Sequence, residues 1–180
     1  MLEKFIKNKN SRKAIGFVIR FFLVYVMLNL FYYGYHRLIF PDTVFFTDLA
    51  AWQSVQLLSW LGEPVSLFVN QDYPKIHVLR AKAAIVSIYE GCNAASLYIV
   101  FLAFIVTFFS FRKELIWFVT GSLIIINVAN IVRIVALYYI SIYQPDDMYF
   151  YHKYVFNVLL FLLVIGLWLL AIKKYHAYKR

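Results

Sequence analysis

Four stretches of apolar residues in this chain are long enough to cross a lipid bilayer, and they limit its fold more than any other feature. A hydrocarbon core about 30 Å thick needs about 20 apolar residues of helix. Arg20 interrupts the first stretch and Arg133 lies near the far end of the third, whereas the second and fourth carry no charge. The stretches cover residues 15–35, 94–111, 115–140 and 154–172. We therefore expect an all-α integral membrane bundle of about four transmembrane helices, forming a single polytopic membrane domain over residues 1–180.

The composition excludes several other classes of protein. Hydrophobic residues make up 63% of the chain and charged residues 15%, against about 45–50% and about 25% in soluble domains. A soluble globule of this length could not bury so much apolar surface. The high apolar content excludes intrinsic disorder, and the single Cys excludes a disulfide scaffold. The first stretch is too long for the apolar region of a signal peptide, so we expect it to be a retained span.

The charges predict how the chain is oriented. Basic residues gather before the first stretch, at Arg112 and Lys113, and after the fourth stretch. Most acidic residues lie in the two remaining connections, residues 36–93 and 141–153. Since Lys and Arg favour the cytoplasmic side, we expect an inner (cytoplasmic) membrane protein with both termini in the cytoplasm and both connections outside. The net charge of +9 is then a topology signal, and nucleic acid is not an expected partner.

The outward insert, residues 36–93, has its own pattern. Thr47 and Asp48 look like a helix start, and apolar residues then recur at helical spacing over residues 48–61. This predicts an amphipathic helix at the membrane surface, with a plain core helix as the alternative. Three β-rich runs follow at residues 65–69, 75–79 and 84–88, separated by turn residues. We expect a small antiparallel sheet that leads into the second span through a tight bend at Gly91.

Three residues that can carry chemistry are expected at the outer membrane boundary. An ionisable residue within a span is a functional-site hypothesis by default, and Arg133 is such a residue. Cys92 lies where the insert enters the second span, and His152 lies in the outer connection just before the fourth. Each has a plainer interpretation: Arg133 reaching the headgroups, Cys92 as an inert buried residue, His152 as a solvated interfacial residue. His36 and His77 are outward too, so position alone does not select His152.

The three residues are more informative together than singly. A Cys nucleophile needs a base and a group that stabilises an oxyanion or holds a carboxylate, and this set supplies all three. Asn127 and Asn130 share a helix face with Arg133, which suggests a supporting polar face or simple bonds between helices. One Cys and scattered His give no metal-ligand spacing, and no Gly-rich phosphate loop is present. We therefore expect no metal and no cofactor.

The order of these residues resembles the exosortase/archaeosortase family of membrane-embedded sorting enzymes. That pattern has a Cys at the start of one transmembrane helix, Asn-x-x-Arg near the outer end of the next, and a His before the following one. This chain has Cys92, then Asn130 to Arg133, then His152. It departs from the common Ala-Cys-Ser-Gly by reading Gly91-Cys92-Asn93-Ala94, and it is similar to short exosortase variants of Bacteroidota.

The resemblance implies a cysteine protease or transpeptidase that acts on exported proteins. The expected partners, besides the lipid bilayer, are substrates with a C-terminal tail made of a short motif, a transmembrane helix and a basic cluster. Cys92 would be the nucleophile, His152 the base and acid, and Arg133 the oxyanion-stabilising or substrate-positioning group. Hydrolysis and transfer remain alternatives, and no oligomeric state follows. The rival interpretations are a non-enzymatic assembly or export-complex subunit and a small transporter or channel.

The expected topology is testable through the single Cys. A membrane-impermeant thiol reagent should label Cys92 in cells whose outer membrane has been permeabilised, because Cys92 faces outward. Labelling that requires rupture of the inner membrane would contradict this orientation. Since a pocket could slow the reaction at Cys92, a Cys introduced at Asp146 on a Cys92→Ala background serves as the exposed control.

Overall fold

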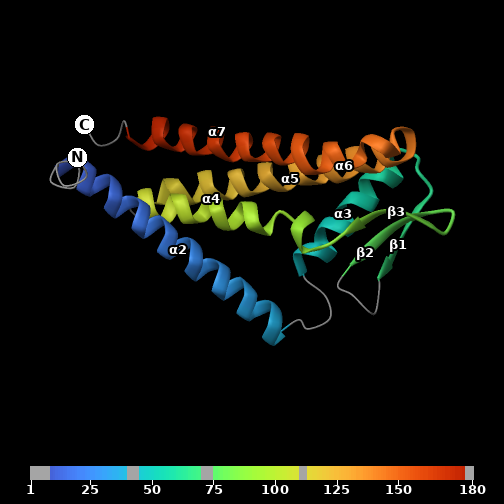
Figure 1. Ribbon diagram of the computed structural model, residues 1–180, viewed down its shortest axis with the longest axis horizontal. Coiled ribbons are helices and arrows are strands. Elements are labelled where there is room, and N and C mark those ends of the chain that lie inside the picture. Colours follow the sequence, from blue (N-terminus) through green and yellow to red (C-terminus); the bar gives the residue numbers. More distant parts are fainter. Residues whose placement is uncertain (1–8, 40–44, 70–74, 110–112, 177–180) are drawn as a thin grey trace.

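Four helices form the body of the protein in the computed structural model, which describes residues 9–39, 45–69, 75–109 and 113–176. They are α2 (Lys9–Ile39), α4 (Ala95–Phe108), α5 (Lys113–Tyr143) and α7 (Phe156–His176). The helices alternate in direction, so that α2 begins and α7 ends at the same end of the molecule (Figure 1). The insert, consisting of α3 and a three-stranded sheet, lies at the opposite end (Figure 1).

Three stretches of helix are long and apolar enough to cross a membrane: Ser11–Tyr35, Lys113–Tyr143 and Pro145–Tyr175. The expected second span corresponds to α4, which is apolar but has only 14 residues, or about 21 Å at 1.5 Å per residue. A membrane location is thus supported by three spans, and a full crossing by α4 stays a prediction. Helix α4 does return the chain along the bundle (Figure 1), as the expected four-span arrangement requires.

The insert contains the expected helix and sheet, with one correction to the helix start. The helix buries Ala50, Ala51 and Leu58 in an apolar core, as the alternative of a core helix expected, and its position at the membrane surface stays a prediction. Helix α3 covers Phe45–Trp60, so it begins before Thr47. Thr47 is therefore not a helix cap; its side chain is buried and its Oγ1 accepts a hydrogen bond from Asn93. Strands β1 (Val65–Val69), β2 (Ile76–Arg80) and β3 (Ala83–Ile88) form an antiparallel sheet in the order β1-β2-β3. The strand boundaries that we predicted from the β-rich runs therefore lie within one residue of those in the structure.

The hairpin between β2 and β3 has an unusual turn. Arg80 pairs with Ala83, which leaves Ala81 and Lys82 as its two central residues. Both have positive φ, 50° and 69°, as a two-residue type I′ turn requires. Asn and Gly tolerate this conformation best, whereas other side chains are strained in it. The ladder also shifts register opposite Val78 and Leu79, which leaves Ile85 as the extra residue of a bulge in β3.

The outer connection between α5 and α7 is mostly helical, contrary to the expected loop over residues 141–153. Helix α5 continues to Tyr143, and the chain then passes through the 3-10 turn η2 (Pro145–Asp147) and the short helix α6 (Met148–Phe150). A π-helical turn, η3 (Tyr151–Val155), follows and joins α7 directly. Backbone hydrogen bonds from Gln144 to Ile140 and from Asp147 to Gln144 keep this mostly exposed segment helical, so that His152 lies on a helix rather than in a loop.

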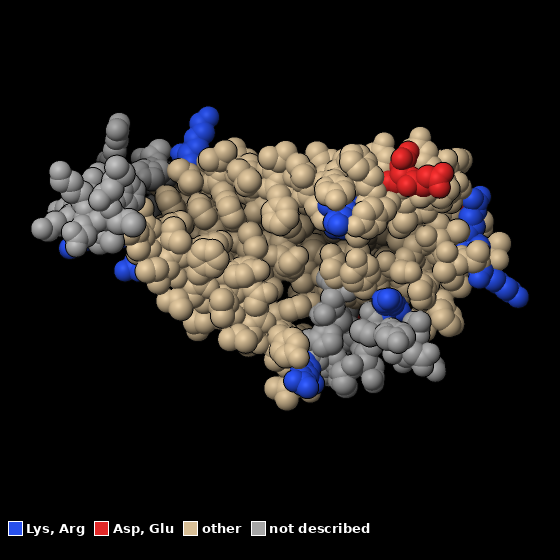
Figure 2. All heavy atoms as spheres, in the orientation of Figure 1, with Lys and Arg blue, Asp and Glu red and all other residues tan. Residues whose placement is uncertain are grey.

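Two apolar clusters hold the molecule together. One joins the insert to the outer half of α5 and includes Cys92 and Tyr138, and the other joins α4, α5 and α7. The Tyr138 hydroxyl donates to Glu63, which also pairs with Arg80, so the insert is tied to α5 by polar contacts as well. Figure 2 shows a wide, largely uncharged surface over the helices, with one small acidic patch and several basic side chains at the insert end. The uncharged surface is the one expected of a bundle that crosses a membrane.

The strained hairpin turn predicts a stabilising double substitution. Replacing Ala81 with Asn and Lys82 with Gly should raise the free energy of unfolding by about 1 kcal/mol, because it removes side-chain clashes at positive φ. Thermal unfolding of the detergent-purified protein should show the midpoint rise by a few degrees. Lys173→Gly, an exposed position within α7, is the matched control and should lower it. An unchanged or lower midpoint for the double variant would show that the turn is not strained.

Candidate active site

Cys92 lies at the junction between the sheet and the membrane helices. Strand β3 continues through extended Tyr89 into the 3-10 turn η1 (Glu90–Cys92), and α4 begins at Ala95. Asn93 fixes this junction: its Oδ1 accepts from the Ala95 N–H at 3.0 Å, and its Nδ2 donates to Thr47 at 3.1 Å. These bonds cap α4 and attach it to α3. Cys92 itself is 5% exposed.

Gly91 fits this junction because its backbone lies close to the Tyr89 ring, and not because its φ is positive. A Cβ at Gly91 would come within 2.9 Å of the Tyr89 ring, so a larger residue would displace that ring. The left-handed conformation occurs instead at Ala94, with φ 62°. The expected bend is therefore present, but Ala94 makes it and Gly91 does not.

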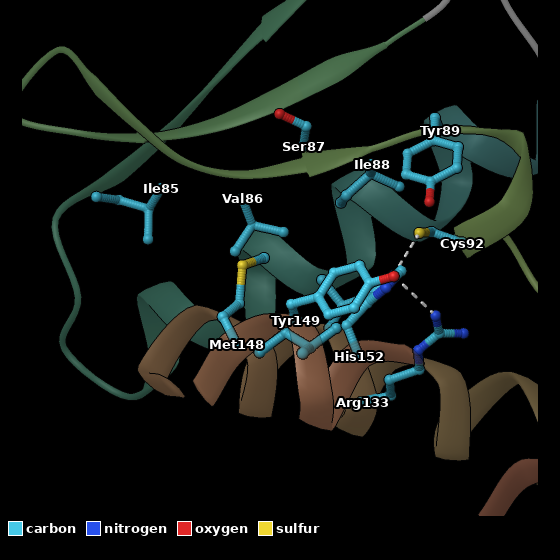
Figure 3. A pocket seen from close by; sticks show the side chains of 12 residues that line it. Ile85, Val86, Ser87, Ile88, Tyr89, Cys92, Arg133, Met148, Tyr149 and His152 are labelled. Carbon is cyan, nitrogen blue, oxygen red and sulfur yellow. Dashed lines mark hydrogen bonds between the residues drawn. The ribbon is translucent and has the colours of Figure 1, made fainter. Parts of the chain in front are cut away.

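His152 lies between Cys92 and Arg133. Its Nε2 is 3.5 Å from the Cys92 Sγ and 3.2 Å from the Arg133 Nη2 (Figure 3). The three residues come from η1, α5 and η3, which are far apart in sequence. The π-helical turn adds a residue to the helix at this point, and such turns are frequent at functional sites. The structure thus brings together all three residues that the sequence nominated.

The contact with Arg133 indicates which tautomer of His152 is present, the one whose Nε2 carries no proton. A guanidinium only donates hydrogen bonds and stays charged, so it pairs with an Nε2 that carries a lone pair. In that form the same Nε2 can accept the proton of the Cys92 thiol. Arg133 thereby favours the base form of His152 on the side that faces the sulfur.

Arg133 is buried and has donor capacity to spare. Its side chain is 5% exposed, and its Nε has no hydrogen-bond partner. Within the described residues, no carboxylate pairs with it. Because a buried unpaired charge is costly, this arrangement points to an acceptor that arrives from outside the chain. A carbonyl oxygen that gains negative charge would be such an acceptor.

The two Asn residues of α5 have different tasks. Asn130 Nδ2 donates to the backbone carbonyl of Cys92 at 2.9 Å, which holds the nucleophile's backbone against α5. Its Oδ1 is buried without a partner. Asn127 lies outside the site: it accepts from Tyr98 and donates to Gln53, both at 3.1 Å. Asn127 thus joins α3, α4 and α5 by hydrogen bonds between helices, which was the alternative to a place in a supporting polar face.

Tyr89 is a site residue that the sequence reasoning missed. Its hydroxyl points toward the Cys92 sulfur (Figure 3). Electrostatic repulsion from a Cys92 thiolate raises the pKa of Tyr89, and burial and a hydrogen bond with Cys92 act in the same direction. The phenol therefore keeps its proton at neutral pH and can donate to a thiolate. A Tyr three residues before a Cys has no sequence signature, because only the turn η1 brings the two together.

These side chains line a cavity of about 310 Å³. One wall is β3 and Tyr89, the opposite wall is Met148, Tyr149 and His152, and the floor is α5 with Arg133 (Figure 3). The Cys92–His152–Arg133 cluster lies at one end of it (Figure 3). The cavity is mostly apolar apart from this cluster, as ligand sites usually are.

The structure thus combines an apolar helical bundle of membrane-spanning length with a Cys–His–Arg cluster where the bundle meets the insert, and Cys92 and Arg133 of that cluster are buried. The chain matches the family model described as transmembrane exosortase over residues 9–171. It therefore belongs to the transmembrane exosortase family, whose members are cysteine peptidases active in protein sorting and processing. No curated protein and no solved structure matches the chain.

The contact between Tyr89 and Cys92 predicts an effect on thiol reactivity. Tyr89→Phe should slow alkylation of Cys92 by iodoacetamide at pH 7 about threefold to tenfold, because the thiolate loses one donor. Intact-mass measurement follows the reaction, since the chain has one Cys. Tyr143→Phe, exposed at the end of α5, should behave as wild type; equal rates for Tyr89→Phe would remove Tyr89 from the site.

Proposed function

We propose that this protein is a membrane-embedded cysteine peptidase that cleaves exported proteins at a C-terminal sorting signal on the extracytoplasmic face of the inner membrane. The observation that carries the proposal is the contact of His152 Nε2 with both Cys92 and Arg133. Membership of the exosortase family supports the substrate class. Both termini are proposed to lie in the cytoplasm, as the distribution of basic residues favours.

The acylation step uses each member of the cluster. Cys92 Sγ attacks the scissile carbonyl carbon as its proton moves to His152 Nε2. Once Nε2 is protonated it no longer accepts from Arg133, so the guanidinium is free to bond the new oxyanion. The tetrahedral intermediate then collapses: the C–N bond breaks, and the leaving amine takes the proton from His152. The product is a thioester between Cys92 and the upstream part of the substrate.

The thioester has two alternative fates. Water attack gives hydrolysis, and attack by an acceptor nucleophile gives transfer. In both, His152 takes the proton of the attacking group and Cys92 leaves as a thiolate, which is reprotonated from His152. The cavity extends from the cluster along β3, and either nucleophile would approach through it.

Substitutions at the cluster should separate the three roles. Cys92→Ala should stop processing of a co-encoded exported protein that carries a tripartite tail, and Cys92→Ser should nearly stop it. His152→Ala should lower processing about 10²–10⁴-fold, the usual contribution of proton transfer. The measurement is the ratio of precursor to processed substrate in cells at matched enzyme abundance. His77→Ala is the matched control, because His77 bonds to Ser87 within the sheet. Normal processing by Cys92→Ser would favour the non-enzymatic alternative.

Arg133→Lys tests whether Arg133 serves the reaction. Lys keeps the charge but lacks the planar fork and the spare Nε donor. We expect the variant to accumulate in the membrane and to process poorly, with Arg80→Lys in the insert as the matched control. Near-normal processing would show that Arg133 only anchors α5, because a Lys could reach the headgroups equally well.

A further inference from the structure

The cavity at Cys92 runs along the free edge of β3. The sheet has the order β1-β2-β3, so β3 pairs only with β2 on one side. Five consecutive residues from Ile85 to Tyr89 line the cavity. Side chains alternate between the two faces of a strand, so a cavity that touches five in a row must border the strand's edge. Figure 3 shows this stretch passing over the helix that carries Met148, Tyr149 and His152.

The backbone of this edge is available for pairing. An edge strand presents unpaired N–H and C=O groups at alternate residues. In the described part of the chain, no backbone group of residues 83–88 bonds outside its pairing with β2. The bulge at Ile85 limits regular geometry to Val86 and beyond, and Tyr89 continues the extended conformation, with φ −137° and ψ 178°. An extended segment of about four residues would match this length.

We infer that the substrate segment preceding the scissile bond binds as an added strand on the free edge of β3, which delivers its carbonyl to Cys92; this inference rests on the proposed function. Backbone hydrogen bonds would supply affinity, while side chains on alternate positions would set selectivity. The class of ligand is therefore an extended peptide, recognised largely by its main chain.

The direction of the added strand follows from the chain path. β3 runs toward the membrane and ends shortly before Cys92, after which α4 begins. A substrate whose downstream part enters the membrane runs the same way, so the added strand is parallel to β3. A second cavity of about 190 Å³ lies beyond the cluster, between the start of α4 and α7, and Arg133 lines both cavities. The second cavity would receive the residues that follow the scissile bond.

Peptidyl chloromethyl ketones test this mode without knowledge of the natural substrate. Their peptide occupies the upstream side, and the Cys92 sulfur displaces chloride to form a C–S bond. With the detergent-purified full chain, acetyl-tetraalanyl chloromethyl ketone should alkylate Cys92 at least about tenfold faster than acetyl-alanyl chloromethyl ketone, because it adds two or more hydrogen bonds. N-methylation at one of two adjacent positions should remove this gain and at the other should not, since only alternate amides face the strand.

Hydrogen exchange gives a second measurement on the same samples. Amides of residues 85–89 should exchange more slowly after reaction with the tetrapeptide reagent than after the short reagent. β1, the other edge of the sheet, is the internal control and should not change. Equal alkylation rates for the two reagents, or unchanged exchange in β3, would overturn strand addition.

The same reaction separates this inference from the proposed function. If Cys92 is a nucleophile activated by His152, His152→Ala should slow alkylation by both reagents to the same degree. A rate that is insensitive to His152→Ala would remove the proposed function, and strand addition with it. A rate that depends on His152 but not on peptide length would overturn strand addition alone.

Discussion

The buried guanidinium of Arg133 is the group around which the outer half of the protein is arranged. A permanent charge in an apolar bundle is stable only where donors and acceptors are matched closely. Here one Nη2 bonds to His152 and the Nε is left without a partner. The unpartnered Nε is a buried donor, and under the proposed function it would bond the oxyanion.

Cys92, the proposed nucleophile, is held by hydrogen bonds to its backbone. Asn130 bonds the carbonyl of Cys92, while Asn93 caps α4 and bonds α3. Ala94 accepts a left-handed conformation between them, at the position where common exosortases read Gly. The hydrogen bond from the Ala95 N–H to Asn93 Oδ1 bridges this strained residue and helps to hold it in place. The Cys92 thiol faces His152 and Tyr89.

The added strand, the thioester and the two cavities would form one continuous path. The upstream peptide would lie along β3, the scissile bond at Cys92, and the downstream part beside α4 and α7. Under the proposed function, main-chain recognition would let one site accept tails of different sequence. The insert would then be a substrate platform and not only a cover for the bundle.

The sequence alone determined the membrane bundle, the strands and the three candidate site residues, because apolar length, alternation and rare intramembrane charge are local signals. It did not determine where α5 ends and α7 begins: backbone hydrogen bonds continue the helical conformation through most of the expected loop, and His152 lies on a helix. The sequence pattern placed the helix start at Thr47 and the tight bend at Gly91. In the structure the helix begins at Phe45, Thr47 bonds to Asn93, and the residue with positive φ is Ala94. Tyr89, the separate tasks of Asn127 and Asn130, and the cavity along β3 depend on residues distant in sequence, and only the tertiary structure could bring them together.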